Sequence, residues 1–324
     1  MNKRIIIPET DLDLSPIGLG TVNAGVDWDG KEADRIIDTY IDLGGNVIDS
    51  ARVYADFVHV NGKVEIGRSE RVIGEWIQRS GKRNQVVLIT KGGHPTYVWP
   101  TDDLHKPRMT PADMRYDIEL SLKTLHTDVI DIYFYHRDNP AQSVEEEIET
   151  MEQFRKEGKI RYYGCSNWAA KRIMEADQYC KEKGYRGFVA DQALLNMGMK
   201  YMNDLPDDTL VYIRGDLLEY HKNNLQNLAM PYMGVASGFF HIFAAKGEEG
   251  VRNNSYYTPD NMKVARLCLE LSKKYHASVS QIVLGFFGSQ EFPCLPLYGP
   301  QNVEQLIDAM GTMNIDFDYS DYQF

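Results

Sequence analysis

The sequence predicts an α/β protein that folds as a single (β/α)8 barrel, or TIM barrel. Eight short runs rich in Val, Ile and Tyr alternate with longer segments in which apolar residues recur at spacings of three and four. The 324 residues divide into eight units of about 40 residues each, which suits one strand and one helix per unit. Because no linker or low-complexity tract divides the chain, we expect one domain over residues 1–324.

Each expected strand is a short apolar run bounded by turn residues. These runs occupy residues 16–19, 46–49, 86–90, 129–135, 160–164, 188–190, 229–232 and 294–297. Helical periodicity covers residues 31–43, 69–80, 110–126, 143–157, 169–183 and 260–275. One helix has a recognisable start, because Thr110 precedes Pro111 and an acidic first turn, which is typical of an N-cap followed by proline.

A doubly wound open sheet is the alternative architecture. That fold requires G-x-G-x-x-G between its first strand and first helix. Residues 18–23 read G-L-G-T-V-N, so Asn23 stands where the third glycine is needed, and the barrel is favoured. Residues 198–208 and 234–259 are long for plain connections, and we expect these loops to lie over the barrel mouth and to serve binding.

The charge balance argues against a nucleic-acid partner. The chain carries 35 basic and 47 acidic side chains, for a formal net charge of −12, and contains no run of Lys or Arg. Half of that charge comes from residues 275–324, which contain six acidic and no basic side chains. Cys165, Cys180, Cys268 and Cys294 lack metal-binding spacing, so we expect reduced structural thiols and no metal site.

Membrane insertion and secretion are not expected. The longest weakly charged stretch, residues 230–245, is interrupted by Pro231 and Gly234 and is shorter than the about 20 residues that span a bilayer. The apolar run near the N-terminus covers only residues 5–7, which is too short for a signal peptide. The expected location is therefore the cytoplasm.

Polar side chains at the ends of three successive expected strands are the candidates for chemistry. Asp49 ends the second strand and Tyr54 follows it, Lys91 follows the third strand, and His136 follows the fourth. Each has an ordinary structural explanation when taken alone: a turn cap, a surface charge or a satisfied core residue. Because active sites of such barrels form at the C-terminal strand ends, we expect the four to converge.

Together these residue types suit the reduction of a carbonyl group. A tyrosine with a pKa near 10 is a poor acid at neutral pH. We expect the Lys91 cation to lower the pKa of Tyr54 and Asp49 to hold the ammonium group in place, while His136 donates a hydrogen bond to the carbonyl oxygen. A site of this kind reduces aldehydes or ketones if a hydride donor lies on the other side of the carbonyl.

Seven motifs in order along the chain resemble those of an aldo-keto reductase. They are G-L-G-T, G-G-N-x-x-D-S-A-x-x-Y, T-K-x-G, S-L-K-x-L-x-T-D-x-I-D, G-x-S-N, D-Q-x-x-x-N and P-x-x-G-P-x-N-V-E-Q-L, at residues 18–21, 44–54, 90–93, 121–131, 164–167, 191–196 and 296–306. The resemblance implies a barrel that binds NADP(H) or NAD(H) in extended form, with a small carbonyl compound as substrate. It also implies that Tyr54 donates the proton, Lys91 and Asp49 tune it, and His136 orients the substrate.

The resemblance also assigns residues to the cofactor. Ser166, Asn167 and Gln192 would bind the nicotinamide carboxamide, and Tyr232 would stack on the ring. The loops at 234–238 and 299–305 would hold the pyrophosphate and adenosine. The full expected set is Gly20, Thr21, Asp49, Ser166, Asn167, Gln192, Tyr232, Met233, Gly234, Ala236, Gly238, Gly299, Pro300, Gln301, Asn302 and Gln305.

Two departures from the family pattern bear on cofactor choice. Relatives that prefer NADPH usually carry Lys or Arg after the eighth strand to bind the 2′-phosphate, but residues 275–324 contain neither. We therefore expect weak discrimination for the 2′-phosphate or use of NADH, unless Lys246 or Arg252 supplies the charge. Ala309 stands where relatives often have an adenine-binding Asn.

The substrate is expected to be a small aldehyde, ketone or sugar-derived carbonyl. Trp28, Val53, Trp99 and Trp168, on loops after the first, second, third and fifth strands, are expected to line its pocket beside Tyr54. The insertion at 94–109 would reshape one wall, and its His94, Asp102 and Asp103 favour a polyol or sugar. Two other functions stay open: a cofactor-sensing or partner-binding module of the same fold, and a lyase or epimerase that uses bound cofactor transiently.

Overall fold

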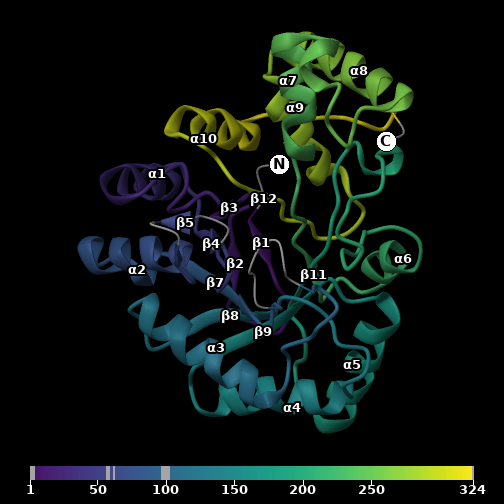
Figure 1. Ribbon diagram of the computed structural model, residues 1–324. Helices are drawn as coiled ribbons and strands as arrows, with labels where there is room; N and C mark the ends of the chain where they lie inside the picture. Colours follow the sequence, from purple (N-terminus) through teal and green to yellow (C-terminus); the bar gives the residue numbers. More distant parts are fainter. Residues whose placement is uncertain (1–3, 56–58, 61–62, 96–102, 323–324) are drawn as a thin grey trace.

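The fold is known from a computed structural model that describes residues 4–55, 59–60, 63–95 and 103–322. It is the expected (β/α)8 barrel, and Figure 1 looks into it along its axis, with the helices arranged in a ring around the strands. The barrel strands, in chain order, are β3 (Gly18–Gly20), β4 (Val47–Asp49), β7 (Val87–Gly92), β8 (Ile130–Tyr135), β9 (Ile160–Ser166), β10 (Ala190–Gln192), β11 (Leu228–Ala229) and β12 (Leu297–Tyr298).

Parallel pairing joins these strands in the order β11-β10-β9-β8-β7-β4-β3-β12. A parallel bridge between Ala229 and Cys294 closes the barrel, supported by the hydrogen bond from Leu295 N to Ala229 O at 2.9 Å. All eight predicted strands are confirmed, with bounds shifted by a few residues.

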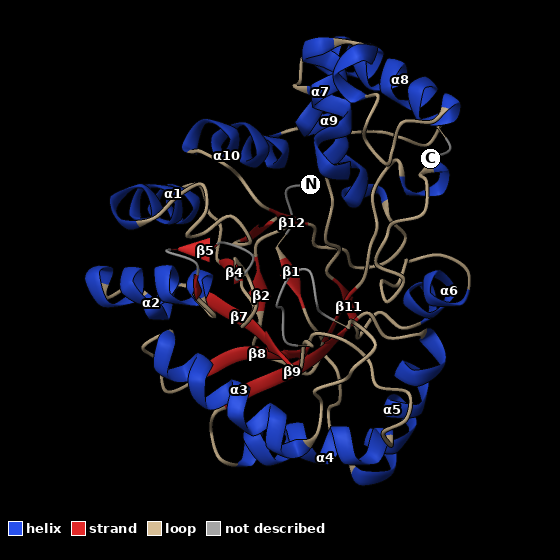
Figure 2. Ribbon diagram, in the orientation of Figure 1, coloured by secondary structure: helices blue, strands red, loops and turns tan. Residues whose placement is uncertain are grey.

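The helices lie outside the strands, as Figure 2 shows in blue around red. They are α1 (Gly30–Asp42), α2 (Arg68–Ser80), α3 (Pro111–Thr124), α4 (Val144–Lys156), α5 (Ala170–Lys183), α6 (Asp216–Asn223), α7 (Phe239–Lys246), α8 (Pro259–Tyr275), α9 (Val279–Gly285) and α10 (Val303–Met310). The six predicted helices are confirmed as α1 to α5 and α8. The short helices α6, α7, α9 and α10 were not predicted, because seven or eight residues give too few turns for a periodic pattern.

Two antiparallel hairpins accompany the barrel. One is formed by β1 (Ile5–Ile6) and β2 (Asp13–Leu14), and the other by β5 (His59–Val60) and β6 (Lys63–Val64). Short 3-10 helices cover Arg83–Gln85, Met199–Tyr201, Ala236–Gly238, Glu248–Val251, Phe286–Ser289 and Gly311–Asn314. Within the described residues no helix is long and apolar enough to cross a membrane.

Successive side chains along each strand point alternately to two hydrophobic cores. One core lies inside the barrel, and the other lies between the strands and the helices. In β8, Ile132 and Phe134 face the barrel interior, while Tyr133 and Tyr135 pack against the surrounding helices. Because both faces are buried, the strands read as continuous apolar runs, which made them predictable. In β7 the same alternation that points Ile89 inward also directs Lys91 into the barrel mouth.

The start of α3 matches its sequence signature. Thr110 Oγ1 accepts a hydrogen bond from Asp113 N at 3.2 Å, and Asp113 Oδ2 accepts one from Thr110 N at 3.2 Å. This reciprocal capping box satisfies two backbone N–H groups that would otherwise lack partners, so the predicted cap is confirmed.

We expect Thr110→Ala to lower the free energy of unfolding by about 1 kcal/mol, because the methyl group cannot accept the Asp113 N–H. Urea unfolding followed by circular dichroism measures this loss. Thr110→Ser, which keeps the hydroxyl, is the matched control and should stay close to wild type. Equal stability of all three proteins would contradict the assigned cap.

Candidate active site

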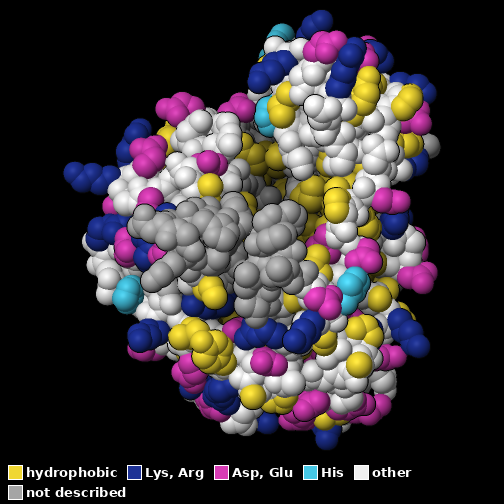
Figure 3. All heavy atoms as spheres, in the orientation of Figure 1, with side chains coloured by type: hydrophobic (Ala, Val, Ile, Leu, Met, Phe, Trp, Pro, Cys, Tyr) yellow, Lys and Arg dark blue, Asp and Glu magenta, His cyan; other side chains and the backbone are white. Residues whose placement is uncertain are grey.

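The predicted catalytic residues meet at the C-terminal ends of the barrel strands. Asp49 ends β4, Lys91 lies in β7, and His136 directly follows β8. Tyr54 lies in a turn after β4, where Arg52 N donates to Lys91 O at 3.0 Å and so holds this turn beside β7. Figure 3 shows this face hollowed at its centre, with hydrophobic side chains lining part of the hollow.

Lys91 is the centre of a buried hydrogen-bond network. Its Nζ lies 2.9 and 2.8 Å from the two carboxylate oxygens of Asp49, 2.7 Å from Ser50 O and 2.9 Å from Tyr54 Oη. Gln192 Nε2 donates to Asp49 Oδ1 at 2.7 Å. Lys91 and Asp49 are each only 1% exposed. Since an ammonium group has donors only, Tyr54 Oη accepts from Lys91 and keeps its own proton for another acceptor.

Burial decides the protonation of Tyr54. It raises the pKa of the Tyr54 hydroxyl well above its usual value of 10.0, and the Asp49 charge raises it further, while Arg137 lowers it. The net shift of this pKa is therefore upward, opposite in direction to the lowering expected from Lys91. Burial also lowers the pKa of Lys91, and Asp49 opposes that shift. At neutral pH the phenol is protonated and available as a donor.

Of two neutral histidines at the site, His136 lies next to the phenol and His94 lies next to His136. The His136 ring is 5.8 Å from the Tyr54 ring and 4.8 Å from the His94 ring, measured between centroids. Burial lowers the pKa of His136 well below its usual 6.5, and it lowers the pKa of His94 to about 4. Within the described residues His136 Nδ1 is buried without a hydrogen-bond partner.

The predicted carboxamide-binding residues form one hydrogen-bonded cluster at the ends of β9 and β10. Ser166 Oγ donates to Gln192 O at 2.8 Å, and Asn167 N donates to the same oxygen at 3.0 Å. Tyr232 OH donates to Asn167 Oδ1 at 2.6 Å, and Val211 N donates to it at 3.1 Å. These contacts fix the side chain of Asn167 and bring the Tyr232 ring to the same side of the site.

Several residues at the same mouth of the barrel have a strained backbone conformation. Of the eight non-glycine residues with positive φ in the described part of the chain, five lie here: Ala55, Asn167, Met233, Ala236 and Ser237. Such conformations cost of order 1–3 kcal/mol each and are typical of ligand-binding segments. Three of these five residues lie in the loop from 233 to 238, which is among the segments predicted to bind the cofactor.

The other predicted cofactor-binding residues lie at the ends of β3 and β12 and in the loops that follow them. Thr21 N and Thr21 Oγ1 both donate to Asp49 O, at 3.0 and 2.9 Å. A Cβ at Gly20 would lie 3.5 Å from the Tyr298 backbone, so the two strand ends approach closely where Gly299 follows. Asn302 caps α10 by accepting from Gln305 N at 2.9 Å. The arrangement fits an extended dinucleotide, with a polar cluster at one end and glycine-containing loops along its length.

The residues predicted to line the substrate pocket differ in their burial and in their hydrogen bonds. Trp28 is 2% exposed and donates to Pro300 O at 3.0 Å, and Trp168 is fully buried and donates to Arg137 O at 3.1 Å. Both indoles are held by packing, and their contact with substrate stays a prediction. Val53 is partly exposed beside Tyr54. Trp99 lies outside the described residues, as does Asp102.

Arg137 was not predicted as a residue of the site. It donates to His136 O, Thr209 Oγ1 and Asp207 Oδ2, each at 3.0 Å, and so ties the long segment after β10 to the end of β8. A cavity of about 350 Å³ opens beside it, with Asn167 in its wall. The signal that could have identified Arg137 is its position in the sequence, directly after His136 at a strand end.

Lys91→Met should destabilise the fold by about 3 kcal/mol or more, because it leaves the Asp49 carboxylate buried without a cation. Urea unfolding measures the change. The double variant Asp49→Asn/Lys91→Met removes both charges and should recover most of the loss. A double variant as unstable as Lys91→Met alone would assign the loss to packing rather than to charge.

Comparisons with known proteins agree with this geometry. The family model described as Aldo/keto reductase family matches residues 16–324. An uncharacterized oxidoreductase of Bacillus subtilis, YrpG, is 30% identical over 325 residues, spanning 95% of this chain and 90% of the relative. Norsolorinic acid reductase B of Dothistroma septosporum is 24% identical over 333 residues, spanning 97% and 78%. An NADP(+) aryl-alcohol dehydrogenase of Phanerodontia chrysosporium is 29% identical over 213 residues, spanning 61% and 52%. With its family model matched over nearly its whole length, the chain belongs to the aldo/keto reductase family of oxidoreductases.

Proposed function

We propose that this protein reduces an aldehyde, ketone or sugar-derived carbonyl to an alcohol with NADH or NADPH. The observation that carries the proposal is the buried arrangement in which Lys91 Nζ bonds both the Asp49 carboxylate and Tyr54 Oη, at the mouth of the barrel. In this reaction Tyr54 is the proton donor, Lys91 and Asp49 tune it, and His136 orients the substrate.

The nicotinamide cofactor supplies the hydride when it is bound. Ser166, Asn167 and Gln192 would hold the carboxamide, and the Tyr232 ring would lie against the nicotinamide. The strained backbone at 233–238 suits the pyrophosphate, and residues 299–305 suit the adenosine. Since the hydrogen bond from Tyr232 fixes Asn167, the carboxamide site is held in place before the cofactor binds.

The protonated state of Tyr54 in the free site allows it to act as the proton donor. Burial keeps the Tyr54 proton in place, so the acid needs no prior protonation. The oxygen of a carbonyl that accepts hydride becomes a strongly basic alkoxide, which can take a proton even from a phenol of raised pKa. Lys91 then stabilises the phenolate left on Tyr54, while the neutral His136 holds the carbonyl oxygen by a hydrogen bond.

Tyr54→Phe should lower kcat by about 10²-fold or more, because it removes the hydroxyl group that donates the proton. The rate is followed as loss of reduced-cofactor absorbance over a panel of aliphatic, aromatic and sugar carbonyls, and cofactor binding is measured separately by fluorescence. Tyr116→Phe, an exposed position on α3, is the matched control and should match wild type. An unaltered rate in Tyr54→Phe would remove Tyr54 from this role, and dinucleotide binding without turnover on the panel would favour a cofactor-sensing module.

The proposed preference between NADH and NADPH is based on the charged side chains near the loop that would hold the adenosine. Glu304 lies in the first turn of α10, and Ala309 is fully buried there and offers no polar side-chain atom. Lys246 is exposed at the end of α7, and the exposed Arg252 pairs with Glu249 at 2.7 Å. We therefore propose weak discrimination for the 2′-phosphate or a preference for NADH, although one relative is named for NADP(+).

Steady-state kinetics with both cofactors test this preference. We expect kcat/KM with NADH to equal or exceed that with NADPH, and Glu304→Lys to shift the ratio toward NADPH by about tenfold through a new phosphate contact. Glu304→Gln separates the loss of a negative charge from the gain of a positive one. A strong wild-type preference for NADPH that falls in Lys246→Ala or Arg252→Ala would overturn the proposal and place the phosphate contact in the loop after β11.

A further inference from the structure

A half-buried arginine joins two carboxylates behind the loops that carry the proposed site. Arg172, in the first turn of α5, donates through Nη2 to Glu147 Oε2 at 2.8 Å and to Asp138 Oδ1 at 3.1 Å. Its Nε also donates to Asp138 Oδ1 at 3.3 Å. The exposed side-chain fractions are 14% for Arg172, 10% for Asp138 and 0% for Glu147. The proposed reaction uses none of these groups.

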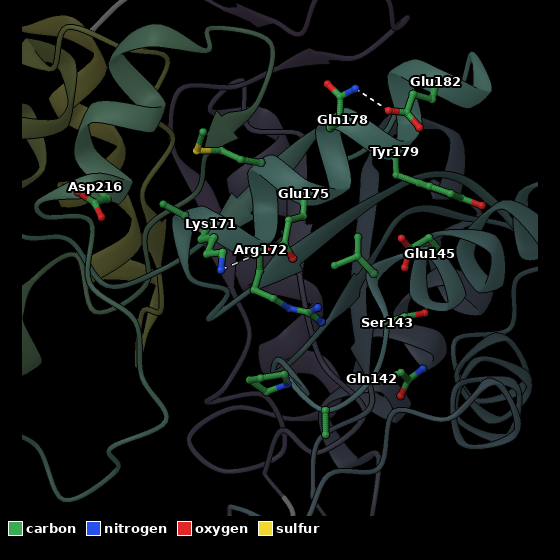
Figure 4. A pocket seen from close by; sticks show the side chains of 15 residues that line it. Gln142, Ser143, Glu145, Lys171, Arg172, Glu175, Gln178, Tyr179, Glu182 and Asp216 are labelled. Atoms are coloured by element: carbon green, nitrogen blue, oxygen red, sulfur yellow. Dashed lines mark hydrogen bonds and ion pairs between the residues drawn. The ribbon is translucent and has the colours of Figure 1, made fainter.

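The three side chains come from three different segments. Asp138 lies two residues after His136, Glu147 belongs to the first turn of α4, and Arg172 lies five residues after Asn167. Figure 4 shows the Arg172 side chain extending from α5 in a cavity of about 840 Å³, whose lining includes Ser143 at the start of α4. Arg172 therefore connects the outer wall of the barrel to the segments after β8 and β9.

Further contacts continue from Arg172 to the proposed active site. The Arg172 guanidinium carbon lies 5.1 Å from the centre of the Trp168 ring, and Trp168 Nε1 donates to Arg137 O at 3.1 Å. Asn167 Nδ2 donates to His136 O at 3.4 Å. The segment that carries His136 and the segment that carries Asn167 are thus bonded to each other directly and also through Arg172.

The charges of this group balance. Burial raises the pKa of Glu147 to about 8; Arg172 lowers it, and Asp138 and the neighbouring Glu146 raise it. Burial thus favours the protonated form of Glu147, while the Arg172 cation is paired with Asp138. Arg172 can then bond both acids without leaving an excess buried charge, which would be costly.

We propose that Arg172 is a positioning residue for the active site. By holding Asp138 and stacking on Trp168, it sets the distance between His136, which orients the carbonyl, and Asn167, which holds the nicotinamide carboxamide. This inference rests on the proposed function for those two residues. A displacement of about 1 Å between reacting groups can cost about 10²-fold in rate, so a group outside the site can control turnover.

The test compares Arg172→Met and Arg172→Lys with Arg155→Met. Arg155 is the matched control, because it also pairs with a buried carboxylate, Glu152, at 2.8 Å but lies on the outer part of α4. Both kcat and the dissociation constant of the dinucleotide are measured, at a temperature well below the melting temperature of each variant. Lysine keeps the charge of Arg172 but loses the planar fork and much of the ring stacking.

We expect Arg172→Met to lose about tenfold or more in kcat or in dinucleotide affinity, Arg172→Lys to recover part of that loss, and Arg155→Met to stay within about twofold in both. If Arg172→Met does not fold, Arg172→Lys decides the question by the same two measurements. Folded Arg172 variants that stay within about twofold of wild type in both quantities would overturn the inference. A wild-type protein that turns over no carbonyl would instead contradict the proposed function, and the dinucleotide affinities would still test Arg172.

Discussion

The buried ion pair between Asp49 and Lys91 is the interaction on which the rest of the site depends. Taking two charges out of water costs several kcal/mol for each ion, so the pair is tolerated only where every polar atom finds a partner. Here the carboxylate also binds Gln192, and the ammonium also binds Ser50 O and Tyr54 Oη. Because these partners come from β4, β7, β10 and the turn after β4, the ion pair fixes four segments relative to one another.

The same pair determines where the proton lies. Lys91 donates into the oxygen of Tyr54, which turns the phenolic proton away from the lysine. Burial that keeps Tyr54 protonated also keeps His136 and His94 neutral. Near neutral pH the site therefore holds its acidic proton on one side chain, with neutral imidazoles beside it, and this division follows from desolvation more than from any single charge.

Much of this arrangement could be predicted from the sequence, and the failures have physical reasons. The eight strands were predictable because they are buried on both faces, and Asp49, Lys91 and His136 were recognisable as polar residues at their ends. The short helices α6, α7, α9 and α10 and the N-terminal hairpin gave no periodic signal. The pKa of Tyr54 was expected in the wrong direction, because the extent of burial depends on tertiary packing that a motif does not record.

At the barrel mouth, the contacts that hold the chain in place change at the point where the strands end. Up to Tyr135 and Ser166 the chain is held by strand pairing. His136 N and Asn167 N still bond the neighbouring strands, at Gly92 O and Gln192 O, and side-chain contacts join the two segments to each other. Asn167 adopts a left-handed conformation and binds His136 O, and the neighbouring Trp168 binds Arg137 O, so side-chain contacts add to strand pairing in holding the two segments together. The ion pair inside the barrel and Arg172 outside it then act on different segments, since one fixes the proposed proton donor and the other is proposed to fix the groups that would bind the carbonyl and the carboxamide.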